Sequence, residues 1–407
     1  MKSNLRNTVG TGFPNFCYEP GKSYGSYAYD SNTNQKYLDL FGMYSSLPLG
    51  HSHPVFKSIV ANTLLPSYFG AKVTNCAMTT QASQRLVQRL ERVAPKDTYG
   101  VHFTSTGALA VEAALKAAFH ALQLKGEQLA GAISFKNSFH GISAMGAQVT
   151  HRTGEPGRRL KCAPSYGWPC VPIDDLEALK VSLEEFPRPV IVEPIQCTSG
   201  DIHLGVETLN ELRSITQHND APLIFDEVQT GFFATGKAWY SDYLDWAPDF
   251  TVFGKKSQVS GFFANEQWGV VFDDPKLLSV TFDGDTLDML RCHLILDFIE
   301  SNSRSLHTRS RAVRKENFEA RVRAVGETFK KELVHPKITD CRALGCLIAI
   351  DLADTQSRDE LVRTLYNTYK VLCNPTGTRS IRLRPSLVIT EDEMNNACAS
   401  ILSALNA

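Results

Sequence analysis

The stretch that decides the fold is PLIFDEVQTG (residues 222–231), in which a short apolar run ends in an acidic pair. Similar runs recur between Gly100 and Gly261, separated by stretches whose apolar residues lie mostly three or four positions apart. Short continuous apolar runs are typical of strands buried on both faces, and the wider spacing is typical of helices. Their alternation predicts an α/β protein with a mostly parallel sheet flanked by helices on both faces.

The individual elements can be placed from these patterns. We expect buried strands at Val101 to Thr104, Ala132 to Phe135, Val190 to Glu193, Leu223 to Asp226 and Phe250 to Phe253. Helical patterns contain Leu109, Leu176 and Leu209. Outside this region we expect a hairpin over residues 24–41, a long helix from about Thr286 to Leu333, strands at Arg342 to Leu352 and Ser380 to Arg384, and a terminal helix at Glu391 to Leu405.

The different patterns at the two ends predict the domain organisation. We expect a large domain over residues 61–300 and a smaller α+β domain built from both chain ends, residues 1–60 and 301–407. A chain of 407 residues is long enough for such a division.

Composition narrows the class of function. The 42 Lys and Arg residues nearly balance 43 Asp and Glu residues, so no overall basic field favours nucleic acid or an anionic membrane. The first 20 residues are polar, and no apolar run approaches the roughly 20 residues that a membrane span needs. The ten cysteines lack the short paired spacings of zinc sites, so we predict no metal. We expect a soluble cytoplasmic protein with reduced thiols, acting on small molecules.

Polar residues follow several of the expected strands, and each has an ordinary alternative. The segment 104–108, TSTGA, opens a helix and offers an anion site, or only a helix cap. Asp226 ends one strand, where it could also be a solvated loop charge. Lys255 and Lys256 follow another strand, where lysines are usually solvated. Phe139 follows a fourth strand and could simply pack.

Taken together, these residues suggest one cofactor. Pyridoxal phosphate requires an amine for a Schiff base, an acid at the pyridine nitrogen, an aromatic ring against its face and a site for its phosphate. The carboxyl ends of parallel strands meet at one edge of a sheet, so the four features are expected to converge there.

On these residues the chain resembles the class III, fold type I, pyridoxal-phosphate aminotransferases, and among them most resembles the lysine 6-aminotransferases. The resemblance covers nearly the whole chain and is specific in combination. It is carried by residues 37–41 (YLDLF), 46–50 (SLPLG), 107–112 (GALAVE), 193–196 (EPIQ), 226–231 (DEVQTG) and 253–259 (FGKKSQV).

The resemblance implies roles around the cofactor ring. Lys256 is similar to the Schiff-base lysine because of its distance to the glycine at 261, and Lys255 is the fallback. By the same resemblance Asp226 pairs with the pyridine nitrogen, Phe139 stacks on the ring, and Val228 packs on the opposite face.

Further roles follow from the same resemblance. Gln229 is expected near the ring hydroxyl, and Gly107 and Ala108 are expected to donate backbone N–H groups to the phosphate. Thr281 resembles the threonine that reaches the phosphate of a partner subunit, which implies a homodimer. Arg382 resembles the arginine that binds the α-carboxylate of 2-oxoglutarate or glutamate.

Two departures from the family pattern concern the substrate. Ile142 stands where an arginine commonly binds a distal carboxylate, and Thr198 stands where a glutamate normally masks the α-carboxylate arginine. We therefore expect a ping-pong aminotransferase that moves an amino group from an amino acid or a terminal amine to a keto acid such as 2-oxoglutarate. An amino acid racemase or epimerase on the same fold is the alternative.

Overall fold

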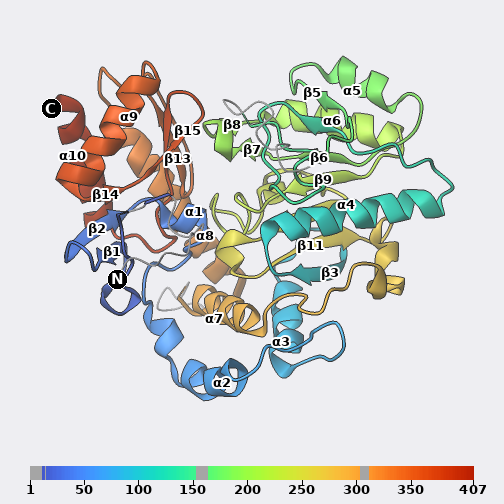
Figure 1. The fold of residues 1–407 in the computed structure, drawn as a ribbon, viewed down its shortest axis with the longest axis horizontal. Helices are drawn as coiled ribbons and strands as arrows, with labels where there is room; N and C mark the ends of the chain where they lie inside the picture. Colours follow the sequence, from blue (N-terminus) through green and yellow to red (C-terminus); the bar gives the residue numbers. More distant parts are fainter. Residues whose placement is uncertain (1–11, 14, 153–163, 303–310) are drawn as a thin grey trace.

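The computed structural model describes residues 12–13, 15–152, 164–302 and 311–407 (Figure 1). Its central sheet has the order β3-β11-β10-β9-β6. β6, β9 and β10 are parallel, and β11 is antiparallel to both β3 and β10, so β3 points the same way as β10. The mostly parallel sheet is confirmed, with one antiparallel strand that was not predicted. The bounds are β3 (Thr98–Thr104), β6 (Val190–Val192), β9 (Leu223–Asp226), β10 (Phe250–Phe253) and β11 (Ser260–Asn265).

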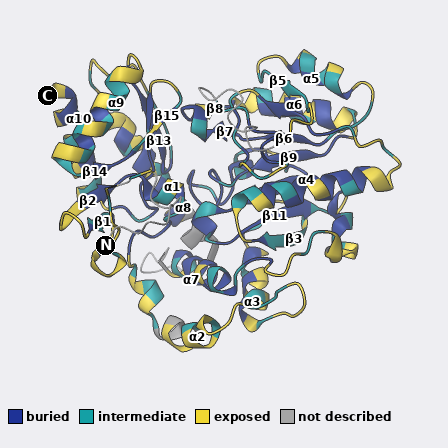
Figure 2. Ribbon diagram, in the orientation of Figure 1, coloured by how far each residue is buried: buried dark blue, intermediate teal, exposed yellow. Residues whose placement is uncertain are grey.

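Helices cover both faces of this sheet because its strands are apolar on both sides. Ile224 and Val252 pack in one apolar cluster with α4 (Gly107–Leu124). Leu223 and Phe225 pack in another cluster, with α5 (Leu176–Leu183) and α6 (Val206–His218). Successive strand residues point to opposite faces, which explains why these strands show continuous apolar runs. Figure 2 shows the buried sheet between partly exposed helices.

A second sheet, in the order β12-β13-β16-β15, lies at the C-terminal end of the chain. Its strands are β12 (Asp340–Leu344), β13 (Leu347–Asp351), β15 (Asn374–Thr376) and β16 (Ser380–Leu383). The prediction of a single strand from Arg342 to Leu352 is wrong, because the chain turns at Gly345 to form an antiparallel hairpin. Gly345 has a φ of +59°, and a Cβ there would lie 2.5 Å from the carbonyl oxygen of Ala234.

The two ends of the chain share a third sheet, which contains β1 (Tyr27–Asp30), β2 (Gln35–Asp39) and β14 (Val371–Leu372). The expected hairpin is present, since β1 and β2 are antiparallel, and β2 also pairs in parallel with β14. Glu393, on α10 (Glu391–Asn406), accepts hydrogen bonds from the backbone and hydroxyl of Ser26. The domain boundaries at residues 60 and 300 stay a prediction.

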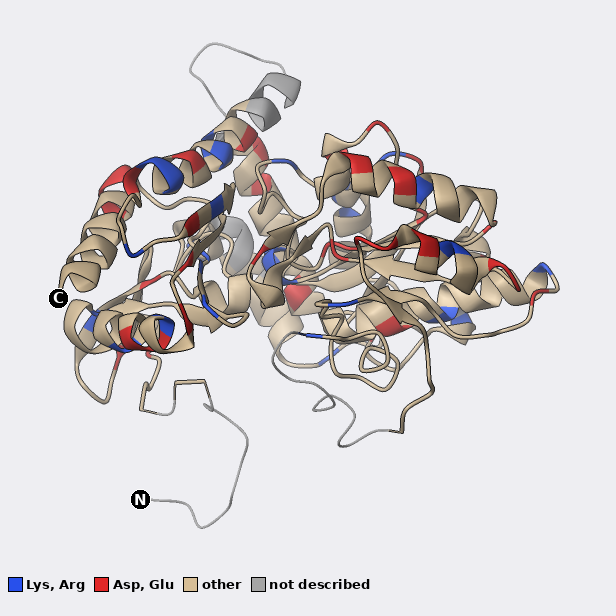
Figure 3. Cartoon of the chain, turned by 90° about the horizontal axis from the view of Figure 1, so that it is seen from above, with Lys and Arg blue, Asp and Glu red and all other residues tan. Residues whose placement is uncertain are grey.

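The expected long helix is divided in the structure. It comprises α7 (Thr286–Asn302) and α8 (Arg311–Glu332), and residues 303–310 lie outside the described part. Figure 3 shows acidic and basic residues interspersed along the outer helices. The other elements are α1 (Gly42–Ser45), α2 (Ile59–Phe69), α3 (Gln81–Leu90), β4 (Ser134–Phe135), β5 (Cys170–Val171), β7 (Ile195–Gln196), β8 (Ile202–His203) and α9 (Thr355–Thr364).

Two further properties concern only the described residues. The nine cysteines among them are free thiols. Within the same ranges no helix has the length and apolarity that crossing a membrane requires.

Candidate active site

A cavity of about 270 Å³ lies where β3, β9 and β10 end. The shared direction of these strands brings their carboxyl ends to one edge of the sheet, where ligands of open α/β sheets bind. The lining residues are Gly107, Ala108, Val111, Phe139, His140, Gly141, Ile142, Glu193, Asp226, Val228, Gln229 and Lys255.

The N-terminus of α4 forms one wall of the cavity. Thr106 caps this helix, since its side-chain oxygen accepts a hydrogen bond from the N–H of Leu109 (3.4 Å). Gly107 and Ala108 are the first two helical residues, whose N–H groups have no acceptor within the helix. A Cβ at Gly107 would lie 2.9 Å from Cγ1 of Val228, so glycine allows the helix to approach the β9 loop closely. This wall suits a negatively charged group.

Asp226 occupies the end of β9 and is held in a fixed orientation. Its Oδ2 lies 2.8 Å from Nδ1 of His140, and its Oδ1 accepts a hydrogen bond from the N–H of Val228 (3.1 Å). Both side chains of the His140–Asp226 pair are buried. Nε2 of His140 is also buried and has no hydrogen-bond partner among the described residues.

Glu193 is a site residue for which the sequence had suggested no role. It follows β6 directly, and its Oε1 accepts a hydrogen bond from the N–H of Phe139 (2.7 Å). Burial, and then the neighbouring Asp226 carboxylate, raise the pKa of Glu193 well above its usual value. The available signal was its position at the end of a predicted strand, the same signal that identified Asp226.

The two adjacent lysines after β10 have different surroundings. Lys255 has a φ of 50°, in the left-handed region, and lines the cavity with Asp226. Burial lowers its pKa, although the Asp226 carboxylate opposes that effect. Lys256 is 1% exposed and is not among the lining residues. Its Nζ has no hydrogen-bond partner in the described ranges, and burial lowers its pKa to about 8.

Two arginines, Arg382 on β16 and Arg384 just after it, differ in whether they have an acidic partner. Arg384 is buried and bonds both oxygens of Asp201 (2.5 and 2.9 Å) and Oε1 of Gln229 (3.0 Å). In the described ranges, no carboxylate lies within 4.0 Å of the guanidinium nitrogens of Arg382. The Arg382 guanidinium lies 6.0 Å from the ring centroid of Tyr44. Burial, and then the positive charge of Arg384, lower the pKa of Arg382 to about 10. Arg382 is therefore the arginine with capacity for a further anion.

Of the remaining residues singled out in the sequence, one lines the cavity and two do not. Ile142 lines the cavity and is 74% exposed. Thr198 and Thr281 are not among the lining residues. The exposed Thr281 precedes Phe282, whose carbonyl oxygen accepts a hydrogen bond from Ser105 (2.9 Å) beside the start of α4. The cavity thus brings together seven of the nine predicted site residues if Lys255 is taken as the lysine, and excludes Arg382 and Thr281.

Comparison with known proteins gives the same family throughout. The model of the class-III aminotransferase family matches residues 9–405. An L-lysine-epsilon aminotransferase of Streptomyces clavuligerus is 32% identical, with 95% of this chain and 89% of the relative covered. An ornithine aminotransferase of Brevibacillus brevis is 27% identical, with 95% and 92% covered.

Solved structures agree with the sequence relatives. Lysine aminotransferase from M. tuberculosis, solved in its internal aldimine form, superposes with a TM-score of 0.87 at 30% identity, covering 96% of this chain and 95% of that one. The chain is a member of the class-III aminotransferases, a pyridoxal-phosphate-dependent family of transaminases.

Proposed function

We propose that this transaminase uses Lys255, rather than Lys256, as the lysine that binds its cofactor covalently. The observation that carries the proposal is that Lys255 lines the cavity with Asp226, Phe139 and Val228, whereas Lys256 does not. A covalent link requires the amine to reach the same space as the ring, so the fallback assignment from the sequence becomes the preferred one.

The residues present fit pyridoxal phosphate. The first turn of α4, with Gly107 and Ala108, would hold the phosphate, and Asp226 would face the pyridine nitrogen. Phe139 and Val228 would pack on the two faces of the ring. When bound there, pyridoxal phosphate supplies an electron sink that stabilises negative charge on the substrate carbon.

The protein groups prepare the proton transfers. Burial lowers the pKa of Lys255, so its amine is neutral more readily and can take a proton from the substrate carbon. His140 holds the Asp226 carboxylate in place through the 2.8 Å contact at Nδ1. A fixed negative charge at this point is an electrostatic partner that needs no reorganisation during the reaction.

Arg382 would bind the carboxylate next to the reacting carbon. Two observations support this role: it has no acidic partner in the described ranges, and its positive charge is close enough to lower the pKa of Lys255. Because Thr198 carries no charge to mask it, we expect Arg382 to favour substrates with an α-carboxylate, such as 2-oxoglutarate and α-amino acids. Ile142 is exposed and provides no charge for a distal carboxylate. Other residues would therefore have to bind the distal carboxylate of a substrate such as 2-oxoglutarate.

We also propose a homodimer in the cytoplasm. The exposed Thr281 lies between Val280 and Phe282, which are 58% and 38% exposed. Contiguous exposed apolar surface of this kind would be covered in an interface between subunits. In the dimer, Thr281 would reach the cofactor phosphate of the partner subunit.

The test of the function is a donor screen on the holoenzyme. Amino acids and terminal amines are incubated with and without 2-oxoglutarate, and glutamate and the chirality of the donor are measured. We expect glutamate only with both substrates. Change of chirality without need for the keto acid would instead support the racemase or epimerase alternative, which the aminotransferase relatives do not favour.

The test of the lysine uses reduction with borohydride followed by peptide mapping. We expect the cofactor on Lys255, and we expect Lys255→Met to lose the link while Lys256→Met keeps it. Attachment to Lys256 would refute the preference for Lys255 and restore the first assignment from the sequence.

A further inference from the structure

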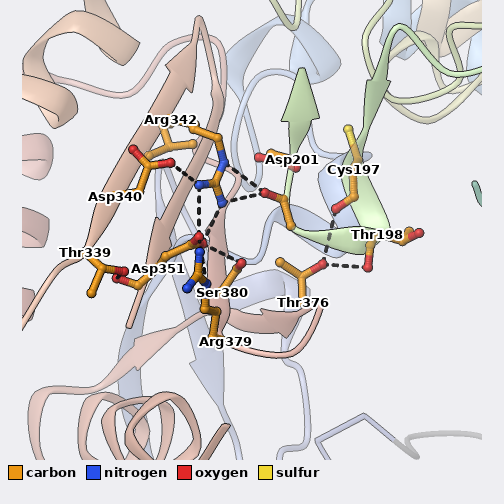
Figure 4. Close-up of polar contacts among 12 residues, drawn as sticks. Cys197, Thr198, Asp201, Thr339, Asp340, Arg342, Asp351, Thr376, Arg379 and Ser380 are labelled. Atoms are coloured by element: carbon orange, nitrogen blue, oxygen red, sulfur yellow. Dashed lines mark hydrogen bonds and ion pairs between the residues drawn. The ribbon is translucent and has the colours of Figure 1, made fainter. Parts of the chain in front are cut away.

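The loop of residues 197–201, between β7 and β8, contacts the sheet that carries Arg382. Thr376, at the end of β15, donates its hydroxyl to the carbonyl oxygens of Cys197 (3.2 Å) and Thr198 (2.8 Å) (Figure 4). The N–H of Gly377 also donates to the Thr198 carbonyl (3.4 Å). The backbone at Thr198, where the family has its masking glutamate, is therefore fixed by the sheet β12-β13-β16-β15.

Arg342, on β12, joins this loop to the sheet at Gly200. Its Nε and Nη2 donate to the carbonyl oxygen of Gly200 (3.1 and 2.7 Å). The same guanidinium pairs with Asp351 (2.5 and 3.0 Å) and with Asp340 (Figure 4). A planar guanidinium can make these bonds at once because its donors lie in a fixed fork, which a lysine amine lacks.

Glycine is required where the loop meets β16. Gly200 has a φ of +109°, and a Cβ there would lie 2.8 Å from Oγ of Ser380. Ser380 in turn donates to Oδ1 of Asp351 (2.6 Å), the carboxylate that Arg342 binds. The loop, β13 and β16 thus meet in one hydrogen-bonded cluster.

The strand segment that carries Arg382 is held on both sides. Ser380 lies two residues before it and belongs to the Arg342 cluster. Arg384 lies two residues after it and bonds both oxygens of Asp201, the residue that follows Gly200. Arg382 therefore lies between two contacts of the sheet with the loop: the Arg342 cluster binds Gly200, and Arg384 binds Asp201.

We propose that Arg342 is a positioning residue for substrate binding: it fixes β16 against the loop of residues 197–201 and so keeps Arg382 in the position from which it would bind the substrate carboxylate. This inference rests on the proposed carboxylate role of Arg382. If the inference is correct, replacing Arg342 weakens the binding of carboxylate substrates more than it affects amines that carry no carboxylate. A residue that only stabilises the fold would affect both kinds of substrate equally.

The test compares Arg342→Met and Arg342→Lys with Arg379→Met in the holoenzyme. Arg379 is a matched control because it pairs with the same Asp351 (3.3 Å), is 53% exposed and has no hydrogen bond to the loop in the described ranges. We measure the Kd of glutarate, a non-reacting dicarboxylate, and kcat and KM for 2-oxoglutarate. The rate with a simple alkylamine that carries no carboxylate serves as the reference reaction.

For Arg342→Met we expect Kd and KM to rise about tenfold or more, as for the loss of charge-assisted hydrogen bonds, with the alkylamine rate and kcat nearly unchanged. Arg342→Lys should recover part of the affinity, and Arg379→Met should stay within about twofold of the wild type. Equal losses with the alkylamine and with 2-oxoglutarate would overturn the inference, as would an unchanged Kd.

The glutarate measurement also separates the two proposals. A wild type that binds glutarate but transfers no amino group refutes the proposed transfer to 2-oxoglutarate, while the effect of Arg342 can still be judged from the Kd ratio. A wild type that binds no dicarboxylate overturns the inference itself. If Arg342→Met does not fold, the smaller change in Arg342→Lys decides the question.

Discussion

Replacing Lys256 with Met removes a buried charge and keeps an unbranched side chain. The Nζ of Lys256 has no hydrogen-bond partner among the described residues, and burial lowers its pKa from 10.5 to about 8. Each pKa unit corresponds to about 1.4 kcal/mol, so the charged amine reduces the free energy of unfolding by about 3 kcal/mol at pH 7. Lys256→Met should recover up to this amount, about 3 to 4 °C in Tm for a chain of this length.

The pH dependence of this effect has a defined sign. Between about pH 8 and pH 10.5 the unfolded chain holds the lysine proton that the folded protein has lost. Lys256 therefore makes the wild type gain stability as pH rises through this window, and Lys256→Met lacks that gain. The difference in Tm between the two proteins should be largest below pH 8 and shrink toward pH 10.5.

The assay is thermal unfolding of both holoenzymes from pH 6.5 to pH 10, with amino transfer measured in parallel. Titratable groups that both proteins contain affect both Tm values equally, so their contributions cancel in the difference between the two Tm values. We expect Lys256→Met to keep its activity, while the control Lys255→Met loses it. A Tm at pH 7 no higher than that of the wild type, or a difference independent of pH, would refute the reasoning.

Three further predictions address the site and its support. Asp226→Asn should keep the cofactor but slow a single turnover about 10²- to 10³-fold, because the fixed negative charge is lost; an unchanged stopped-flow rate would contradict this. Thr281→Ala should weaken cofactor retention about tenfold or more, as for one hydrogen bond to a charged acceptor, and a monomer that retains cofactor fully in dialysis would argue against it. Arg384→Met should lower the unfolding free energy by about 3 to 5 kcal/mol, because Asp201 remains buried without a partner. The double variant with Asp201→Asn, which removes the charge and tolerates the φ of 52° at this position, should regain part of this loss in denaturant titrations, and no recovery would refute the explanation.

The central strands could be predicted because their apolar runs reflect burial on both faces. Leu223–Asp226 and Phe250–Phe253 have the predicted bounds. The antiparallel β11, Ser260–Asn265, was missed because it follows β10 after a short turn and contains only two large apolar residues. Its place between β3 and β10 is set by pairing with residues about 160 positions away, which local patterns do not report.

The order of the two lysines could not be predicted from spacing. Which amine faces the cavity depends on the left-handed backbone at Lys255 and at Gln258. Lysine and glutamine give no local sign of such a conformation, which usually indicates glycine or asparagine. The bond from Arg342 to the Gly200 carbonyl joins residues 142 positions apart, and nothing near either residue in the sequence indicates it.

The sheet shared by the two chain ends has a consequence for synthesis on the ribosome. β2 pairs with β14, whose residues are made roughly 330 positions later. At about 5 to 20 residues per second, the β1–β2 hairpin waits roughly 15 to 70 s with one edge unpaired. An unpaired edge can bind other strands, so this interval is when a newly made chain is most open to misassembly. Slower translation of the C-terminal segment would lengthen the exposure without altering any contact in the finished protein.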